Sequence, residues 1–454
     1  MSCSKWFLLA ALPLTIHATD DPDGTTPLHW AVRSNDLDAA QRLLHTGANP
    51  DAANRYGVTP LSLAAQNGSS PMIQALLQAG ARPTSAILMT AAHTGNAEVV
   101  RMLLARGADA NARESSLGET ALMWAAAEDH PEAVRALIEH GADPNARSDK
   151  LVYPKDRFGL EGVTTILPHG SWTALMYAAR QGSLEAARTL AEMGAELNVA
   201  DPDGTTALEL AILNGHFDTA ALLAEKGADS NIADSAGMVA LYAAVDMNTL
   251  GEIYGRPGRP STDKLSAVDL LPILLAHGAN PNATLKSPTL NRAHTPGEPS
   301  LGEGTTPLMR AAKNGDVAAM RVLMTHGADA GLKQKNGTTA LMLAAGVGRG
   351  TGVFAKDYAT EAELLAAVKF LVELGVDVNA ANDAGQTALH IAAQASDGIV
   401  KYLAEHGANL DAKDKQGRTA LDVAMGKGVR ARIGGESTVR ESTAALLRQL
   451  TSSR

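Results

Sequence analysis

The side chains that could carry out chemistry are few in this sequence of 454 residues, and their spacings fit no common catalytic motif. Cys3 is the single cysteine, and it lies close to the N-terminus. The sequence contains no H-E-x-x-H, no G-x-S-x-G and no C-x-x-C, the patterns typical of zinc peptidases, serine hydrolases and thiol or zinc sites. We therefore expect no enzyme, no catalytic residue, no bound metal and no cofactor.

Four histidines recur at one place in the sequence pattern. Each directly precedes a glycine that ends a predicted helix: His140, His277, His326 and His406. One interpretation is a metal-binding ladder, but stacked helices lie about 10 Å apart, which is too far for one ion to join two of them. The other is a helix C-terminus, where histidine can bond to the free carbonyl groups and complement the helix dipole. The second interpretation is favoured.

Two further patterns resemble ligand sites. Met89, Met123 and Met176 occupy equivalent positions and could hold Cu(I) if they stacked, but methionine at a helical core position is ordinarily packing material. The glycine-rich residues 346–352 lack the lysine and the preceding strand of a nucleotide-binding loop. We expect core packing at the methionines and a plain loop at the glycines.

The elements that would position such side chains recur along the chain, most clearly in residues 304–330, GTTPLMRAAKNGDVAAMRVLMTHGADA. Thr306 followed by Pro307 predicts the capped start of a helix. Gly315 ends this short helix, and Asp316 caps a second helix whose apolar positions share one face. Because two short helices cannot enclose that face alone, the pair needs a neighbour on each side.

Copies of this unit fill the chain. They begin near residues 26, 59, 86, 120, 173, 206, 239, 306, 339, 387 and 419, and five of the ten intervals are 33 or 34 residues. Thr26-Pro27-Leu28-His29 and the Gly-Ala-Asp/Asn ends of most copies resemble the ankyrin-repeat family, in particular its exported bacterial members. The resemblance implies an all-α repeat solenoid of about eleven stacked repeats, each with two helices and a β-turn finger. Few copies have histidine at the fourth position, so the family's histidine hydrogen bonds are expected to be interrupted.

Insertions interrupt the repeats near residues 148–171, 247–264, 284–303, 346–360 and 426–435. The first and third stand where a finger should be, and the others separate the two helices of a repeat. The first, which contains Tyr153 and Phe158, is expected to be a structured loop. The interval of 27 residues before the third copy shows the opposite change, a missing finger. The final helix, 442–450, is followed by polar residues and is predicted to cap the stack.

The composition limits the partners and the compartment. A net charge of −10 with 4% aromatic residues does not suit nucleic acid. Residues 1–18 combine Lys5, an apolar run over 6–16 and Ala18, which is typical of a secretory signal peptide and too short to span a bilayer. We predict cleavage after Ala18 and export to the periplasm or the medium, leaving one monomeric domain, 19–454, without cysteine. The alternative is the capping N-terminus of a cytosolic protein.

Ankyrin repeats bind partners through the residues after the paired alanines of each first helix and through the finger tips. These positions vary in this chain while their neighbours repeat. The resemblance implies partner-binding roles for Arg33, Gln66, Asn67, His93, Glu128, Arg180, Gln181, Asn214, Lys313 and Asn314 on the helices, and for Tyr153 and Phe158 on the first insertion. Trp30, Trp124 and Tyr177 lie on the same helices as further anchors.

Two functional hypotheses follow. The first is a non-catalytic scaffold that binds one or more proteins in the groove of repeats five to seven, between the two finger insertions. The second is an enzyme or small-ligand receptor whose site is assembled from the insertions, around Tyr153, His169, Tyr254 and His294. Insertions that fold over one pocket would favour the second.

Overall fold

The computed structural model describes residues 21–152, 159–160, 163–164, 169–249, 262–289, 300–346, 359–427 and 439–452. Within these residues the chain forms 22 helices and one pair of two-residue strands. The elements are α1 (Pro27–Arg33), α2 (Leu37–His45), α3 (Pro60–Asn67), α4 (Ser70–Gln78), α5 (Ser85–His93), α6 (Ala97–Ala105), α7 (Ala121–Ala127), α8 (Pro131–Glu139), β1 (Gly159–Leu160), β2 (Val163–Thr164), α9 (Ala174–Gln181), α10 (Leu184–Glu192), α11 (Ala207–Leu213), α12 (Phe217–Glu225), α13 (Ala240–Thr249), α14 (Ala267–Ala276), α15 (Pro307–Lys313), α16 (Val317–Thr325), α17 (Ala340–Ala344), α18 (Glu361–Glu373), α19 (Ala388–Ala392), α20 (Asp397–Glu405), α21 (Ala420–Ala424) and α22 (Glu441–Ser452).

The helix boundaries follow the capping chemistry that the sequence predicts. Thr306 has an extended backbone, and its hydroxyl accepts from the Met309 N–H at 3.3 Å at the start of α15. Gly315 follows α15 with φ of +67°. Glycine adopts this left-handed conformation easily because it has no Cβ. Asp316 then accepts from the Ala319 N–H at 3.0 Å and caps α16. The local prediction for residues 304–330 is confirmed.

The third repeat begins earlier than the sequence alignment indicated. The alignment on the paired alanines places its capping position at Ala86, whereas Thr84 caps α5 by accepting from the Ile87 N–H at 3.4 Å. Helix α5 therefore begins at Ser85 and spans 9 residues, against 7 in α1. Because threonine caps a helix far better than alanine, the hydroxyl at Thr84 decides the boundary.

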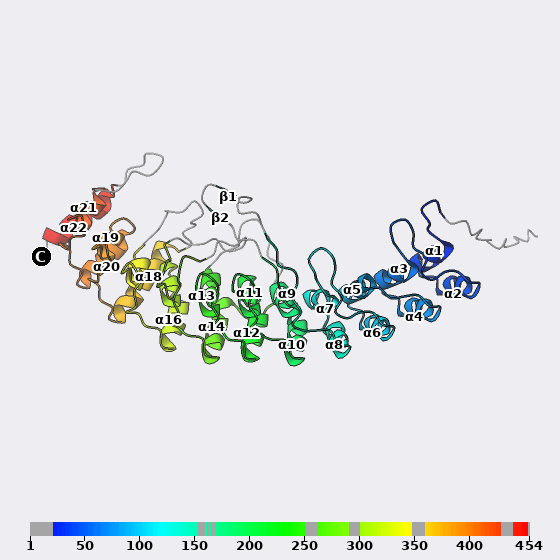
Figure 1. The fold of residues 1–454 in the computed structure, drawn as a ribbon. Coiled ribbons are helices and arrows are strands. Elements are labelled where there is room, and N and C mark those ends of the chain that lie inside the picture. The colour runs from blue at the N-terminus through cyan, green and yellow to red at the C-terminus, as the bar shows by residue number, and fades with distance from the viewer. Residues whose placement is uncertain are drawn as a thin grey trace, which may run out of the picture. The chain divides into compact units, whose positions relative to one another are not determined.

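The chain divides into two compact units, one formed by residues up to 125 with 130–143 and the other by 126–129 with 144–454. Within the second unit, the first helices α9, α11 and α13 lie side by side in one row, and the second helices α10, α12 and α14 form another row (Figure 1). In the first unit α1, α3 and α5 pack in sequence, as do α2, α4 and α6. Paired alanines allow the helices of a repeat to approach closely, since Ala311 and Ala312 are 1% and 0% exposed. The predicted repeat solenoid is confirmed.

Several fingers are tight turns held by the side chain of their first residue. The carboxylate of Asp234 accepts from the N–H groups of Ala236 at 2.9 Å and Met238 at 2.8 Å. A backbone bond also joins neighbouring fingers, as between the Ser235 N–H and the Asp203 carbonyl at 2.9 Å. The turn is therefore satisfied locally, and such backbone bonds link neighbouring fingers in several places.

Asparagines form a second ladder along the stack. Asn231 accepts from the Asn280 N–H at 2.8 Å and donates to the Gly278 carbonyl at 2.8 Å. Asn282 makes the same two contacts with Asp329 and Gly327, at 2.8 and 3.0 Å. Where it is present, the final asparagine of Gly-Ala-Asp/Asn-x-Asn thus ties one repeat to the next, which explains why the pattern recurs with the period of the fold.

The first finger insertion has a paired base. The Ser148 N–H donates to the Trp172 carbonyl at 2.9 Å, and the Leu151 N–H donates to the His169 carbonyl at 2.7 Å. Farther along, β1 and β2 pair in antiparallel register. The rest of the expected structured loop lies outside the described residues. In the other finger insertion, the Leu285 N–H donates to the Thr305 carbonyl at 3.0 Å, as at the base of an ordinary finger.

The last helix ends the stack as predicted. In α22, Thr443, Ala444 and Leu447 are buried against the preceding repeat, whereas Arg448 and Gln449 are exposed. A repeat stack needs such a helix at its end, because the outer face meets water. Among the helices that the structure describes, none combines the length and the apolar character needed to cross a membrane.

Candidate functional site

We define the first-helix surface as the side chains at the fifth, eighth and ninth positions of each repeat, counted from the residue that caps the first helix. In the third repeat the count starts at Ala86, so that its paired alanines take the same places as in the other repeats. In the first unit Arg33, Gln66, Asn67 and His93 belong to it, and all four are exposed. Glu128, assigned to the second unit, is exposed as well. These side chains therefore lie outside the core, and their role in partner binding stays a prediction.

The same positions of the second unit are less open than predicted. Those that are half-buried are Arg180, Gln181, Asn214, Lys313 and Asn314. The guanidinium of Arg180 lies 5.2 Å from the ring centre of Trp172, and the side chain of Asn214 donates to the Leu210 carbonyl at 2.8 Å. The expectation of full exposure is wrong here, because these side chains contact neighbouring groups of the protein.

A buried ion pair links the seventh and eighth repeats within the first-helix surface. Arg310 and Asp246 are 6% and 7% exposed, and the Arg310 Nε–H donates to an Asp246 carboxylate oxygen. Arg310 also donates to the Asn314 side chain at 2.7 Å, and Asn314 donates to the Thr249 hydroxyl. Sequence reasoning missed this pair. The sequence feature that could have revealed the pair is an arginine at the fifth position of one repeat and an aspartate at the eighth position of the repeat before it.

Aromatic side chains mark the first-helix surface of the first unit. Trp30 is 50% exposed; its indole N–H donates to Asp21 at 2.9 Å, and the Arg33 guanidinium lies 5.5 Å from its ring centre. Trp124 is half-buried and meets the His93 ring edge-on, with ring centres 5.2 Å apart. Exposed aromatic and arginine side chains are frequent anchors of protein interfaces.

The base of the first insertion gathers charged and aromatic groups. His169 contacts the Asp203 carboxylate at 2.9 Å, and the indole N–H of Trp172 donates to Asp201 at 3.2 Å. Burial raises the pKa of Asp201 above its ordinary value. The hydrogen bond that Asp201 accepts from the Thr205 N–H acts in the opposite direction but has the smaller effect. The cluster fastens the insertion to the following finger.

The proposed small-ligand site is only partly within the described structure. His169 is described and contacts Asp203, whereas Tyr153, Tyr254 and His294 lie outside the described residues, as does Phe158. In the described part of the chain, His, Cys, Asp and Glu side chains form no group of three or more that could hold a metal ion. What the structure places at the base is a histidine–carboxylate contact that positions a loop.

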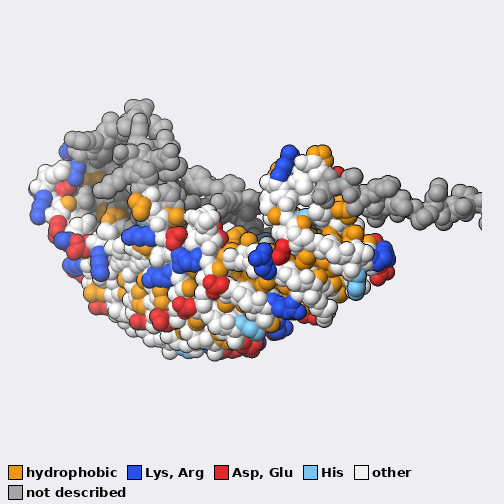
Figure 2. All heavy atoms as spheres, turned by 45° about the vertical axis from the view of Figure 1, so that its right-hand side comes forward, with side chains coloured by type: hydrophobic (Ala, Val, Ile, Leu, Met, Phe, Trp, Pro, Cys, Tyr) orange, Lys and Arg blue, Asp and Glu red, His pale blue; other side chains and the backbone are white. Residues whose placement is uncertain are grey.

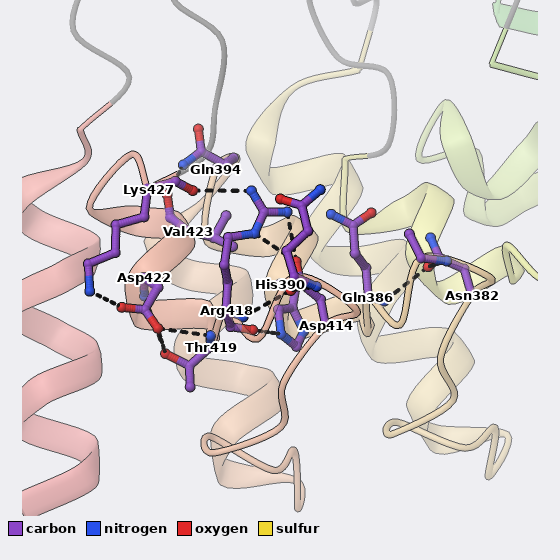
Figure 3. Close-up of polar contacts among 12 residues, drawn as sticks. Asn382, Gln386, His390, Gln394, Asp414, Arg418, Thr419, Asp422, Val423 and Lys427 are labelled. Carbon is purple, nitrogen blue, oxygen red and sulfur yellow. Dashed lines mark hydrogen bonds and ion pairs between the residues drawn. The ribbon is translucent and has the colours of Figure 1, made fainter.

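In the tenth and eleventh repeats, polar contacts join fingers to first helices (Figure 3). His390 contacts the Arg418 carbonyl through Nε2 at 3.0 Å. Arg418 donates from Nε to the buried Asp414 at 2.8 Å and from Nη1 to the Lys427 carbonyl at 3.1 Å. Gln394, at an eighth position, donates to the Val423 carbonyl. Polar side chains near this surface therefore also fasten neighbouring repeats to one another.

The histidine contacts typical of the fold are formed where histidine is present. His29 bonds to the Thr26 hydroxyl at 2.8 Å and to the Val58 carbonyl at 3.0 Å. At the equivalent positions Met123 and Met176 are 1% and 0% exposed, which confirms the packing interpretation, whereas Met89 is half-buried.

The four histidines before glycine lie at helix ends. His140, His326 and His406 each bond through Nδ1 to the carbonyl four residues earlier, at 2.8 Å, and His277 is the C-cap residue of α14. The structural interpretation of this recurring position is confirmed.

Acidic and basic side chains alternate over the surface. On the face drawn in Figure 2, Lys and Arg are interspersed with Asp and Glu among apolar and neutral side chains. Nucleic-acid partners usually need a contiguous basic field. This face shows mixed charge instead.

Comparison with known proteins agrees with this architecture. The family described as "Ankyrin repeats (3 copies)" matches residues 3–87, 84–148, 157–234, 264–353 and 357–431. The chain therefore belongs to the ankyrin-repeat family, whose repeats typically serve as scaffolds for protein–protein interaction and are generally non-catalytic. Among the solved structures similar to it is the crystal structure of the human ASB11 ankyrin repeat domain, at 23% identity and a TM-score of 0.42, covering 61% of this chain and 96% of that chain. No curated protein matches the sequence.

Proposed function

We propose that this chain is a non-catalytic scaffold that binds one or more partner proteins through its first-helix surface and its finger loops. The observation that supports the proposal most is the contrast along each first helix. In the second repeat, Ala64 and Ala65 are fully buried, and the next two side chains, Gln66 and Asn67, are exposed. The buried positions repeat and the exposed ones vary, as expected of a surface that recognises a partner.

In the second unit the proposal concerns the two finger insertions. The described ends of 148–171 and 284–303 begin and close as fingers do, so both loops leave from the same element of their repeats. Tyr153 and Phe158 remain our proposed anchors on the first loop. Long loops within compact domains are often functional.

The test of the scaffold is a paired substitution in the full chain. Arg33 and His93 change to Ala together, and the partner is recovered by affinity purification from the native envelope. We expect at least tenfold less partner with the melting temperature lowered by no more than about 2 °C, because exposed positions usually change stability by under about 0.5 kcal/mol. The control is Arg101→Ala on α6, a half-exposed side chain of a second helix. Equal recovery with both variants would remove the first-helix surface of the first unit from the proposal.

We further propose that the protein is exported and cleaved after Ala18, since residues 1–18 have the pattern of a signal peptide. Intact-mass measurement on the native protein tests this. A mature chain that begins at Met1 and is recovered from the cytosol would refute it.

A further inference from the structure

One finger is missing between the second and third repeats. Six residues, 79–84, join α4 to α5, whereas 14 residues, 46–59, join α2 to α3. Arg82 still makes the contact that begins a finger, donating from its backbone N–H to Asp51 at 2.8 Å. The chain then enters α5 directly through its cap, Thr84.

The missing finger affects one backbone carbonyl and one backbone N–H, which lie in the turns before and after the gap. In every finger pair that bonds, the second residue of one turn donates its N–H to the carbonyl of the third residue of the turn before it. The instances are Arg55 to Asp23, Ser235 to Asp203, Lys286 to Ala236, Lys335 to Glu303, Asp383 to Asn336 and Lys415 to Ala384, at 2.8–2.9 Å. Across the gap the corresponding groups are the Tyr56 carbonyl and the Ser115 N–H. Neither has a backbone partner among the described residues.

The floor of the gap is unusually open. Most fourth-position side chains of the other repeats lie in the core, as with Met309 and Met342 at 1% and 0% exposure, and Asp422 of the eleventh repeat is the exception. Beside the missing finger, Ser62 and Met89 are both half-buried. Because the finger is missing, the Met89 side chain and the Ser62 hydroxyl are partly exposed where a finger would otherwise cover them.

Apolar side chains stand on both rims. Tyr56, in the finger before the gap, is 66% exposed, and Leu117, in the finger after it, is 39% exposed. The Arg55 guanidinium lies 4.7 Å from the Tyr56 ring centre and restrains that ring. We call the Tyr56 carbonyl, the Ser115 N–H and the side chains of Tyr56, Met89 and Leu117 the notch. All of it belongs to the first unit.

We propose that the notch binds a reverse-turn loop of a partner protein, which takes the place of the missing finger. The inference rests on the scaffold function and names its recognition element. The sequences of the chain's own finger turns indicate which loop can take the place of a finger. Five of these turns are Asn54–Gly57, Asp201–Gly204, Asp234–Gly237, Asn382–Gly385 and Asp414–Gly417. The occupant is therefore a loop with aspartate or asparagine first and glycine fourth, because the side chain must close the turn and the fourth residue must take positive φ.

The bound loop would use the ordinary chemistry of the finger ribbon. Its second residue donates to the Tyr56 carbonyl, and its third residue accepts from the Ser115 N–H. Main-chain bonds of this kind supply affinity, and the side chains at the rims and floor supply selectivity, as when a peptide adds to an open sheet edge.

The experiment uses the full chain and a disulfide-cyclised peptide that carries Lys-Asp-Lys-Gln-Gly-Arg-Thr, the sequence of residues 413–419, whose second turn residue has a backbone N–H to donate. Methionine methyl NMR follows the titration, and the control peptide replaces the aspartate in its second place with lysine and the glycine with valine. We expect a saturable shift of the Met89 methyl group with the first peptide alone and no shift at buried Met309. Tyr56→Ser and Leu117→Ser should each weaken the binding at least fivefold, whereas Leu374→Ser, an equally exposed leucine of the second unit, should leave it unchanged.

Several results would overturn the proposal. They are equal binding of both peptides, a shift confined to residues outside the notch, and a Met89 shift that depends on protein concentration without peptide, which would assign the notch to a second copy of the chain. A further variant inserts Asp-Lys-Gln-Gly-Arg-Thr after Pro83. It should lose peptide binding and at least tenfold of partner recovery while its melting temperature holds or rises. If partner recovery survives this insertion and the two rim substitutions but is lost in the Arg33 and His93 variant, the notch is refuted and the scaffold function stands.

Discussion

Asp422 is a residue whose charge the fold stabilises strongly. Lys427 donates to one of its oxygens at 2.5 Å, and the Thr419 N–H and hydroxyl donate to the other at 3.1 and 3.0 Å. The hydrogen bond from Lys427 has the largest effect on the pKa of Asp422, and the hydrogen bonds from Thr419 add to it. The pKa is lowered to about 2. Because the folded pKa lies below the unfolded one, the stabilisation is fully present above pH 4 and is lost as the pH falls towards 2.

Substitution of Asp422 by Asn should therefore have a pH-dependent effect. At pH 7 we expect a loss of about 1 to 2 kcal/mol in the free energy of unfolding, since one pKa unit corresponds to about 1.4 kcal/mol and the site is partly screened by water. Near pH 2 the variant and the parent should be equally stable. Denaturation curves between pH 2 and 7 measure this difference, and a constant difference across that range would contradict the electrostatic origin.

Arg180 and Gln181 should differ in their effect on stability, although both are first-helix surface residues. Arg180 lies over the Trp172 ring, whose indole N–H is bonded to Asp201. We expect Arg180→Ala to cost about 0.5 to 1 kcal/mol, in the range of a cation–π contact, and Gln181→Ala to cost under about 0.5 kcal/mol. Thermal unfolding of the two single variants checks the order, and the reverse order would mean that the Trp172 contact does not stabilise the fold.

At the level of elements, the crossing of the two helices in a repeat depends on small side chains. Ala311 is 1% exposed between α15 and its neighbours. We expect Ala311→Leu to destabilise the chain by about 1 to 3 kcal/mol, because a packed crossing has no room for three more carbon atoms. Ala318→Leu on the exposed face of α16 is the matched control. Denaturant titration should separate the two variants, and similar midpoints would show that the crossing can adapt.

The contact between α13 and α15 depends on a buried ion pair. Asp246→Ala would leave the Arg310 charge without its carboxylate, and losing one partner of a buried pair typically costs about 3 to 5 kcal/mol. A second change, Arg310→Leu, should restore most of the loss. The fifth position is already leucine in other repeats, for example the fully buried Leu343. Denaturant titration of the single and double variants measures both steps. A double variant no more stable than Asp246→Ala would show that Arg310 contributes in other ways.

Helix starts and ends could be predicted because they depend on neighbours in the sequence. A threonine or aspartate cap and the glycine that follows a helix act within a few residues, as Thr306 and Gly315 show. The contact of Arg310 with Asp246 joins residues 64 positions apart, so no local rule reveals it. The start of α5 was misjudged for a related reason: the alignment followed the buried alanines, whereas the cap at Thr84 sets the boundary.

At the scale of the whole molecule, the period of the sequence predicts the stack but not every surface on it. Each repeat contacts its neighbours, so a 33-residue pattern is enough to imply a solenoid. The exposure of individual side chains depends on what has been inserted or deleted beside them. Arg180 is half-buried beside an insertion, and Met89 is half-buried beside a deletion, although both occupy regular positions of the repeat. The division of the chain into two units is likewise absent from the sequence pattern.

The first finger insertion offers the most direct test of how the second unit binds its partner. Its base is held by contacts that do not involve residues 152–168: the bridge between Lys150 and Gly170, the Ser148 bond to Trp172, and the contact of His169 with Asp203. Replacement of residues 152–168 by Asn-Gly should therefore leave the base folded and lower the melting temperature by no more than about 2 °C, because a two-residue turn can close such a paired base.

Partner recovery from native cells should fall at least tenfold in this deletion variant, since our proposed anchors Tyr153 and Phe158 are removed with the loop. The control is Asp203→Ala, which weakens the base and keeps the loop. It should lower the melting temperature with a smaller effect on recovery, because the anchors remain in the chain. Undiminished recovery together with a lowered melting temperature in the deletion variant would mean that the loop shields the repeats beneath it, and the binding surface of the second unit would then have to be sought on its first helices alone.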